Sequence, residues 1–190
     1  MIDPKKNDLK IRSDKKKGIF IEDLTETYIS CPEEVYALMK IARDSRAIAS
    51  TNMNERSSRS HMLFLLTISQ SNTEDLSAKT GKLYLVDLAG SEKVGKTGAE
   101  GKVLDEAKKI NVSLTALGKV INNLTDGKST HIPYRDSKLT RVLQESLGGN
   151  SKTSLIVTCS PHVSNSPETL STLRFGISAK KIKNKPKINK

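Results

Sequence analysis

Two polar loops carry residue types that could bind the phosphates of a nucleotide. The first is Asp87-Leu88-Ala89-Gly90, in which an acid and a glycine stand three residues apart. The carboxylate of Asp87 can hold a water molecule of a bound magnesium ion, and the backbone N–H of Gly90 can reach a terminal phosphate. Such a tetrapeptide is also frequent by chance, and taken alone a strand followed by an ordinary turn explains it more simply.

The second loop, Asn54–His61, reads NERSSRSH and brings hydroxyl groups together with guanidinium groups. Serine hydroxyls suit magnesium and phosphate oxygens, and a planar guanidinium can pair with a carboxylate through two parallel hydrogen bonds. Without further context, a solvated polar loop with a charged tip is an equally good interpretation.

The segment Gly90–Thr97 matches the phosphate-loop pattern GxxxxGK[ST] literally and follows an apolar stretch. We reject it as a phosphate cradle, because Glu92 would face the anion and because Gly98 and Gly101 would interrupt the helix that must begin at Lys96. It also overlaps the acid–glycine motif. An unconventional NTPase that uses this segment as its phosphate cradle is kept as a third hypothesis.

The elements that must position these loops alternate between strands and helices. Met62–Ile68 and Lys82–Leu88 are almost continuously apolar, which is typical of strands buried on both faces, and Ser154–Thr158 is a third candidate. Asp87 falls at the carboxyl end of its strand, where open α/β sheets bind ligands. Helical spacing and end signals predict helices from Ser30 to about Ile48 and over about 103–124, 137–147 and 167–181, after a hairpin over 9–29.

This alternation predicts an α/β fold with a central, mostly parallel sheet and helices on both faces. Three core strands are too few for such a sheet, so we expect the sheet to be incomplete in this chain. Apolar sheet surface should then be exposed.

The composition of the 190 residues points to an acidic partner. The net charge is +11 and the pI is about 9.6. Nucleic acid is not the expected partner, because zinc-finger spacing and RNP-like motifs are absent and aromatic residues make up only 4%. No apolar run or signal peptide indicates a membrane, so we expect an intracellular protein. Cys31 and Cys159 lack metal-ligand spacing and are predicted to be buried free thiols.

Together the two loops resemble switch I (54–61, NxxSSRSH) and switch II (87–92, DLAGSE) of kinesin motor domains. The resemblance extends through 98–118, 131–150 and 171–184, and its register is closest to conventional kinesin. It implies a partial three-layer, P-loop NTPase-like motor domain over 1–182 and the start of a neck linker over 183–190. On this resemblance the chain begins after the family's phosphate loop.

The resemblance also implies a site for ATP or ADP with magnesium. Nucleotide contacts would come from Asn54, Ser57, Ser58, Asp87 and Gly90. Ser58 would bind the metal directly and Asp87 through water. Arg59 would pair with Glu92 and close both switches over the nucleotide, which completes an implied catalytic set of Ser58, Arg59, Asp87, Gly90 and Glu92.

A microtubule is the partner that the resemblance implies, and its acidic surface agrees with the net charge. The helix over about 103–124 would be the relay, and the loop and helix over 131–147 would bind the filament. The implied contact residues are Lys93, His131, Tyr134, Arg135, Lys138 and Arg141. A solvated basic helix face is the alternative interpretation.

The leading hypothesis is therefore part of a cytoplasmic microtubule motor, which in the complete protein couples ATP hydrolysis to movement. The chain alone is expected to hydrolyse little ATP. The alternative is a non-catalytic microtubule-binding module. Neither nucleic acid nor membrane is an expected partner, and the oligomeric state should depend on sequence outside the chain.

Overall fold

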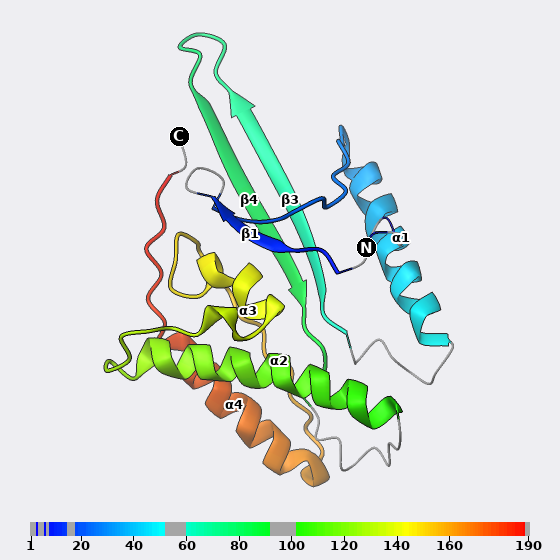
Figure 1. Cartoon of the computed structure of the whole chain (residues 1–190), viewed down its shortest axis with the longest axis vertical. Coiled ribbons are helices and arrows are strands. Elements are labelled where there is room, and N and C mark those ends of the chain that lie inside the picture. Colours follow the sequence, from blue (N-terminus) through cyan, green and yellow to red (C-terminus); the bar gives the residue numbers. More distant parts are fainter. Residues whose placement is uncertain are drawn as a thin grey trace. The chain divides into compact units, whose positions relative to one another are not determined.

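The structure is a computed structural model, shown in Figure 1. The described backbone comprises Asp3, Lys6, 8–14, 18–51, 60–91 and 102–188, and the side chains of 47–51 and 102–111 lie outside the description. The chain divides into two compact units, residues 1–12, 20–90 and 188–190, and residues 13–19 and 91–187. The first contains the long strands, and the second contains most of the helices.

The long strands of the first unit are β3 (Met62–Ser71) and β4 (Ala78–Asp87), which pair antiparallel with Met62 opposite Asp87. A short turn joins them, in which the N–H of Asn72 donates to the carbonyl of Ser77 at 2.8 Å. The pair is antiparallel, whereas a mostly parallel sheet was predicted for the domain as a whole. The reason is the short connection, because parallel neighbours need a crossover of about a dozen or more residues.

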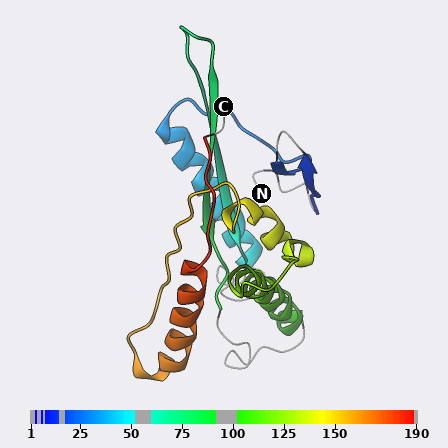
Figure 2. The same cartoon turned by 90° about the vertical axis from the view of Figure 1, so that its left-hand side faces the viewer.

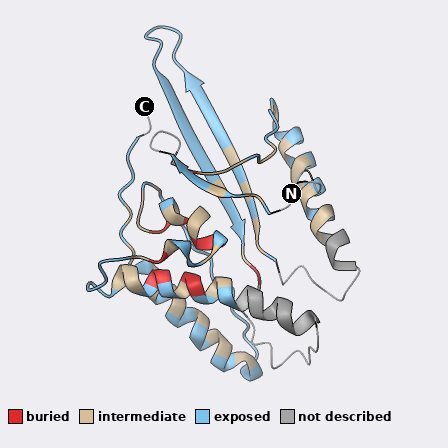
Figure 3. Cartoon of the chain, viewed as in Figure 1, coloured by how far each residue is buried: buried red, intermediate tan, exposed pale blue. Residues whose placement is uncertain are grey.

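Both faces of the β3–β4 sheet are apolar. Opposite residues of an antiparallel pair share a face, so Leu65 and Tyr84 lie on one face while Leu66 and Leu83 lie on the other. Leu65 keeps 39% of its surface exposed and Leu83 keeps 47%. Within the described residues these faces are thus not buried, contrary to the prediction for single strands but as expected for an incomplete sheet (Figure 3).

A small sheet and one helix complete the first part of the chain. β1 (Ile11–Asp14) pairs with β2 (Gly18–Ile21), inside the predicted hairpin region. Helix α1 spans Pro32–Thr51. Ser30 and Glu33 have the spacing of a capping box, but the N–H and hydroxyl of Ser30 both donate to Glu34 Oε2 instead, at 2.6 and 3.2 Å. Helix α1 begins with Pro32, so the carboxylate that accepts the bonds from Ser30 belongs to Glu34 and not to Glu33.

The second unit is built on α2 (Lys102–Thr125), which extends about one residue beyond the predicted helix at each end. Its side chains Leu117, Val120 and Ile121 are buried, and Val120 has no exposed surface. α2 packs against α3 (Lys138–Val142) and α4 (Ser166–Lys180), and Figures 1 and 2 show α2 and α4 side by side. The spacing of apolar residues along α2 therefore did identify a core-facing stripe.

The helix predicted over 137–147 is broken into shorter turns. 3-10 turns at Tyr134–Asp136 and Gln144–Ser146 flank α3, and Leu143 ends it with non-helical backbone angles (φ −85°, ψ 6°). Thr140 is fully buried, and its hydroxyl bonds the carbonyls of Tyr134 and Ser137 at 2.8 and 3.0 Å. Such side-chain bonds to the backbone compete with a continuous helix.

The predicted strand Ser154–Thr158 is irregular in the structure, and Cys159 beside it is exposed while Cys31 is half-buried. A strand needs a neighbour to satisfy its backbone, and among the described residues none pairs with this segment. Both thiols were predicted to be buried. Cys31 is only half-buried, and Cys159 is exposed because the segment beside it does not pair as a strand. No helix in the described part of the chain is long and apolar enough to cross a bilayer.

The carboxyl-terminal segment after α4 lies along the end of the α3 region. Asn184 Oδ1 accepts from the N–H of Gly148 at 2.7 Å, and its Nδ2 donates to the carbonyl of Ser146 at 3.1 Å. The N–H of Lys185 donates to the carbonyl of Gly149 at 2.9 Å. Pro186 follows, so the residue without an N–H stands where no donor is used.

Candidate functional site

Much of the site predicted from sequence lies outside the described residues. This applies to Asn54, Ser57, Ser58, Arg59, Glu92 and Lys93, and therefore to the predicted pair between Arg59 and Glu92. Asp87 and Gly90 are described, as are Ser60 and His61 at the end of the first polar loop. The structure thus describes the residues at which each loop joins its strand, at the start of β3 and the end of β4, which lie side by side.

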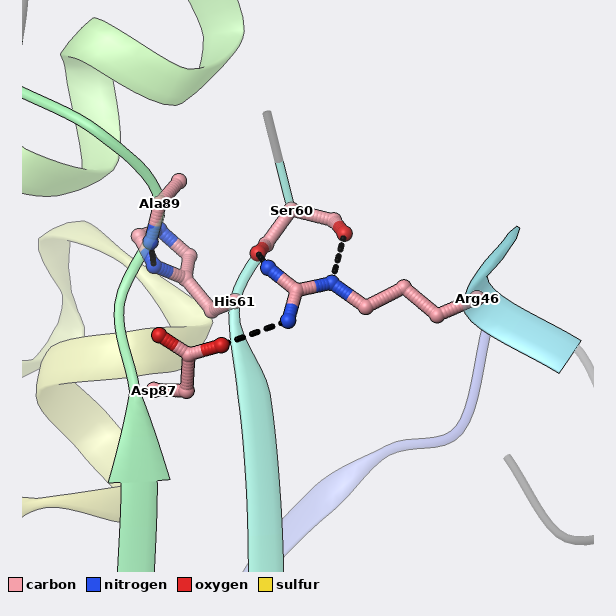
Figure 4. Close-up of polar contacts among 5 residues, drawn as sticks. All are labelled: Arg46, Ser60, His61, Asp87 and Ala89. Atoms are coloured by element: carbon pink, nitrogen blue, oxygen red, sulfur yellow. Dashed lines mark hydrogen bonds and ion pairs between the residues drawn. The ribbon is translucent and has the colours of Figure 1, made fainter. Parts of the chain in front are cut away.

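A guanidinium group joins these two strand ends. Arg46 of α1 donates from Nη1 to Asp87 Oδ2 at 2.6 Å, from Nε to the Ser60 hydroxyl at 3.1 Å and from Nη2 to the Ser60 carbonyl at 2.7 Å (Figure 4). The side chain of Arg46 is only 17% exposed, whereas that of Asp87 is 60% exposed. The guanidinium is therefore held by the fold, and the carboxylate still faces solvent.

Arg46 was not predicted to be a site residue. The pair with Asp87 joins residues 41 positions apart, and no local pattern in α1 marks this arginine among its basic neighbours. One signal could have identified it. Arg46 stands shortly before the serine-rich loop 54–61, and no counter-ion had been predicted for Asp87 at its strand end. A planar fork of donors is suited to bridging a carboxylate and a carbonyl.

His61 makes a second connection between the two loops. The N–H of Ala89 donates to His61 Nδ1 at 2.9 Å, so Nδ1 carries no proton in this arrangement (Figure 4). Ala89 is buried and precedes Gly90. Partial burial, followed by the positive charge of Arg46, lowers the pKa of His61, and the charge of Asp87 opposes this shift. The environment thus favours the neutral imidazole that the hydrogen bond requires.

Acidification is expected to destabilise the chain through His61. The pKa of His61 is lower in the folded chain than in the unfolded chain, where it is about 6.5. As the pH falls below about 6.5, the unfolded chain therefore binds a proton first. Stability is lost until the pH has fallen through the lowered folded-state pKa. Asparagine can place an acceptor oxygen near the position of Nδ1 without titrating. Urea unfolding at about pH 7.5 and 5.5 should show a smaller loss for His61→Asn than for the unchanged chain. An equal loss in both would show that His61 is not the cause.

A second group of predicted residues lies at the end of the loop that follows α2. His131, Arg135 and Lys138 are exposed. Arg141 is half-buried, and its guanidinium donates to the side-chain oxygen of Gln144. These three exposed residues, together with Arg141, form what we term the basic face.

Tyr134 differs from the basic face in its contacts. Its hydroxyl donates to the carbonyl of Leu147 at 2.6 Å, and burial, followed by the charge of Glu145, raises its pKa. The phenol therefore fastens the turn before α3 to the turn after it. A filament contact from Tyr134 stays a prediction, and its hydroxyl already has a partner inside the unit.

The basic face is supported by α2 beneath it. Leu139 and Leu143 are buried where α3 meets α2, and Lys119 Nζ of α2 lies 2.8 Å from Asp136 Oδ2. This ion pair is largely exposed, so it contributes little stability, at most about 1 kcal/mol. The pair connects the turn that carries Arg135 to α2.

Comparisons with known proteins identify the family of the chain. The kinesin motor domain family model matches residues 1–182. The chain is 63% identical over 189 residues to a kinesin heavy chain of Botryotinia fuckeliana, covering all of this chain and 22% of that protein. It is 56% identical over 184 residues to the kinesin heavy chain of Drosophila melanogaster, covering 97% and 19%. The chain thus spans about a fifth of the length of these curated relatives.

Solved structures show the same relationship. A fast kinesin is 63% identical, with a TM-score of 0.87 over 95% of this chain and 51% of that chain. A KIF14 dimer with AMP-PNP in complex with a microtubule is 43% identical, with a TM-score of 0.86 over 95% of this chain and 52% of that chain.

Proposed function

Because the chain belongs to the kinesin motor domain family, we propose that it is the part of a microtubule motor that senses the γ-phosphate of ATP and binds the filament. The observation that carries the proposal is the basic face, which packs on α2. The amino-terminal end of α2 comes directly after the loop that begins at Asp87. In this proposal the β3–β4 sheet belongs to a three-layer domain with a mostly parallel central sheet.

The described part of the nucleotide site fits a hydrated magnesium ion and a phosphate. Asp87 offers an exposed carboxylate at a strand end, and hard oxygen donors of this kind suit magnesium. Magnesium, when bound with ATP, would neutralise charge on the phosphates. Arg46 bonds the Asp87 side chain and His61 bonds the N–H of Ala89, and in this proposal the N–H of the next residue, Gly90, would meet the γ-phosphate.

The remaining roles at this site follow the family pattern. Asn54, Ser57 and Ser58 would contact the nucleotide, with Ser58 on the metal, and Arg59 would pair with Glu92 when the γ-phosphate is present. Closure of this pair would order the attacking water, since a donor and an acceptor would then flank it. The chain is expected to turn over little ATP by itself.

α2 is proposed to be the relay between the two sites. It begins at Lys102, after the switch II loop, and ends at Thr125, before the loop that carries His131. A helix is stiff along its axis, so a displacement at one end reaches the other. Lys119 and the buried Leu117 and Val120 couple this movement to the basic face, which would bind the acidic microtubule surface together with Lys93 and Tyr134.

The segment 183–190 is proposed to be the start of the neck linker, and Asn184 within it bonds Gly148 and Ser146. Asn184→Ala removes the acceptor for the Gly148 N–H and the donor to Ser146, and each net hydrogen bond is worth about 1 kcal/mol. Amide exchange at Gly148 and Lys185 should therefore accelerate by about tenfold or more. Asn184→Asp keeps the acceptor only, and should be intermediate. Unchanged exchange in the alanine variant would contradict docking.

A non-catalytic microtubule-binding module is the alternative function, favoured by the same basic face. Pelleting the chain with microtubules in Mg-AMP-PNP and in Mg-ADP separates the two. The motor proposal predicts different affinities in the two nucleotides, and the module predicts equal ones. For a cradle at Gly90–Thr97, Lys96→Ala must abolish nucleotide binding, and retained binding would exclude it.

A further inference from the structure

Asp126 forms a compact turn directly after α2. Its Oδ1 accepts from the N–H of Lys128 at 2.9 Å and from the N–H of Ser129 at 3.0 Å. Its Oδ2 accepts from the Ser129 hydroxyl at 2.6 Å. These bonds, those of the Ser129 hydroxyl first, lower the pKa of Asp126, so the carboxylate stays ionised. One side chain thus holds three donors of the loop.

The turn determines how the loop leaves α2. The N–H of Asp126 still donates to the carbonyl of Asn122 at 2.9 Å, as in the helix, but the next residue, Gly127, has a φ of +67°. Glycine adopts this angle at little steric cost, and it also has more conformations to lose than any other residue. The Asp126 carboxylate supplies the bonds that select one of those conformations.

The far end of the same loop is fixed separately. Tyr134 is bonded to Leu147 and Asp136 to Lys119, as described above. His131 lies between the two fixed ends, two residues after Ser129 and three before Tyr134. Loss of either end would let the loop sample many conformations and would cost binding free energy when it is ordered again.

We propose that Asp126 is a positioning residue for microtubule binding, because its carboxylate fixes the 126–129 turn and thereby the loop that presents His131 beside Arg135 and Lys138. The inference rests on the proposed function of the basic face. It assigns to an acid a favourable role on a surface that must meet an acidic partner.

Electrostatics and positioning predict opposite signs at this position. Removing a negative charge from a surface that faces an acidic filament should strengthen binding by simple attraction. If the carboxylate positions the loop, removing its acceptors should weaken binding instead. The three donors to Asp126 are neutral, so the carboxylate keeps its charge, and the sign of the change in binding shows which effect is larger.

The test compares Asp126→Ala with Asp126→Asn in microtubule pelleting of the 190-residue chain at fixed salt. Both variants lose the same charge, but asparagine keeps Oδ1 as the acceptor for Lys128 and Ser129, and Asx turns accept either residue. We expect the alanine variant to bind about fivefold more weakly than the asparagine variant. The asparagine variant should bind at least as tightly as the unchanged chain. Equal binding by the two variants would overturn the proposal.

Amide exchange without microtubules provides the second measurement. The N–H groups of Lys128 and Ser129 should exchange faster in Asp126→Ala, and should stay protected in Asp126→Asn. If the unchanged chain does not pellet at all, the proposed function fails and this inference fails with it. If it pellets and the two variants do not differ, only the role of Asp126 is overturned.

Discussion

Reversing both exposed charges of the basic face, Arg135→Glu with Lys138→Glu, is expected to lower microtubule affinity by about 100-fold. Both side chains are exposed on the same short segment, and Asp136 and Leu139 hold that segment on α2. Placing like charges opposite an acidic surface costs on the order of several kcal/mol. Pelleting with a titration of microtubules measures the change directly.

The matched control is Lys152→Glu with Arg174→Glu. These cations are also exposed but lie outside the basic face, and the change in net charge is identical. If long-range attraction by the +11 chain were the whole cause of binding, both pairs of substitutions would weaken it equally. The specific proposal predicts a much smaller effect for the control, of about threefold or less at physiological salt.

Gly149→Ala is expected to destabilise the second unit by about 1–3 kcal/mol. An added Cβ would lie 2.7 Å from the Cα of Glu145 and 2.8 Å from its carbonyl oxygen, so backbone rather than a flexible side chain must move. The carbonyl of Gly149 also accepts from Lys185, so the carboxyl-terminal segment should detach. Urea unfolding and amide exchange at Lys185 measure the two effects.

Gly118→Ala is the control with the opposite sign. Gly118 lies inside α2, and an added Cβ would meet nothing within 4 Å. Alanine in a helix interior is more favourable than glycine by about 0.5–1 kcal/mol, so this variant should be more stable. A Gly149→Ala chain as stable as the unchanged one would show that the close approach at Glu145 does not constrain the fold.

Local periodicity explains why α2 was predictable. Leu117, Val120 and Ile121 recur at helical spacing and are buried, and the helix ends within about one residue of the predicted bounds. The two loops identified the family for a different reason, because the residues of each motif are contiguous in the sequence. The family match over residues 1–182 confirmed that identification.

Contacts between distant residues were not predictable from local patterns. Arg46 bonds Asp87 and Ser60 across the sheet, and the Tyr134 hydroxyl reaches Leu147 rather than solvent. The apolar runs of β3 and β4 indicated burial on both faces but contained no information on pairing direction, which the short turn between them decides. The end of α3 at Leu143, inside the predicted helix, was likewise not predictable from the spacing of apolar residues.

Binding of the unmodified 190-residue chain to microtubules, measured by pelleting over a range of salt concentrations, tests the central claim most directly. The proposal predicts that the chain pellets with microtubules at low salt and that its affinity falls steeply as salt screens the basic face. A chain that stays in the supernatant at low salt, or binds with an affinity independent of salt, would contradict it.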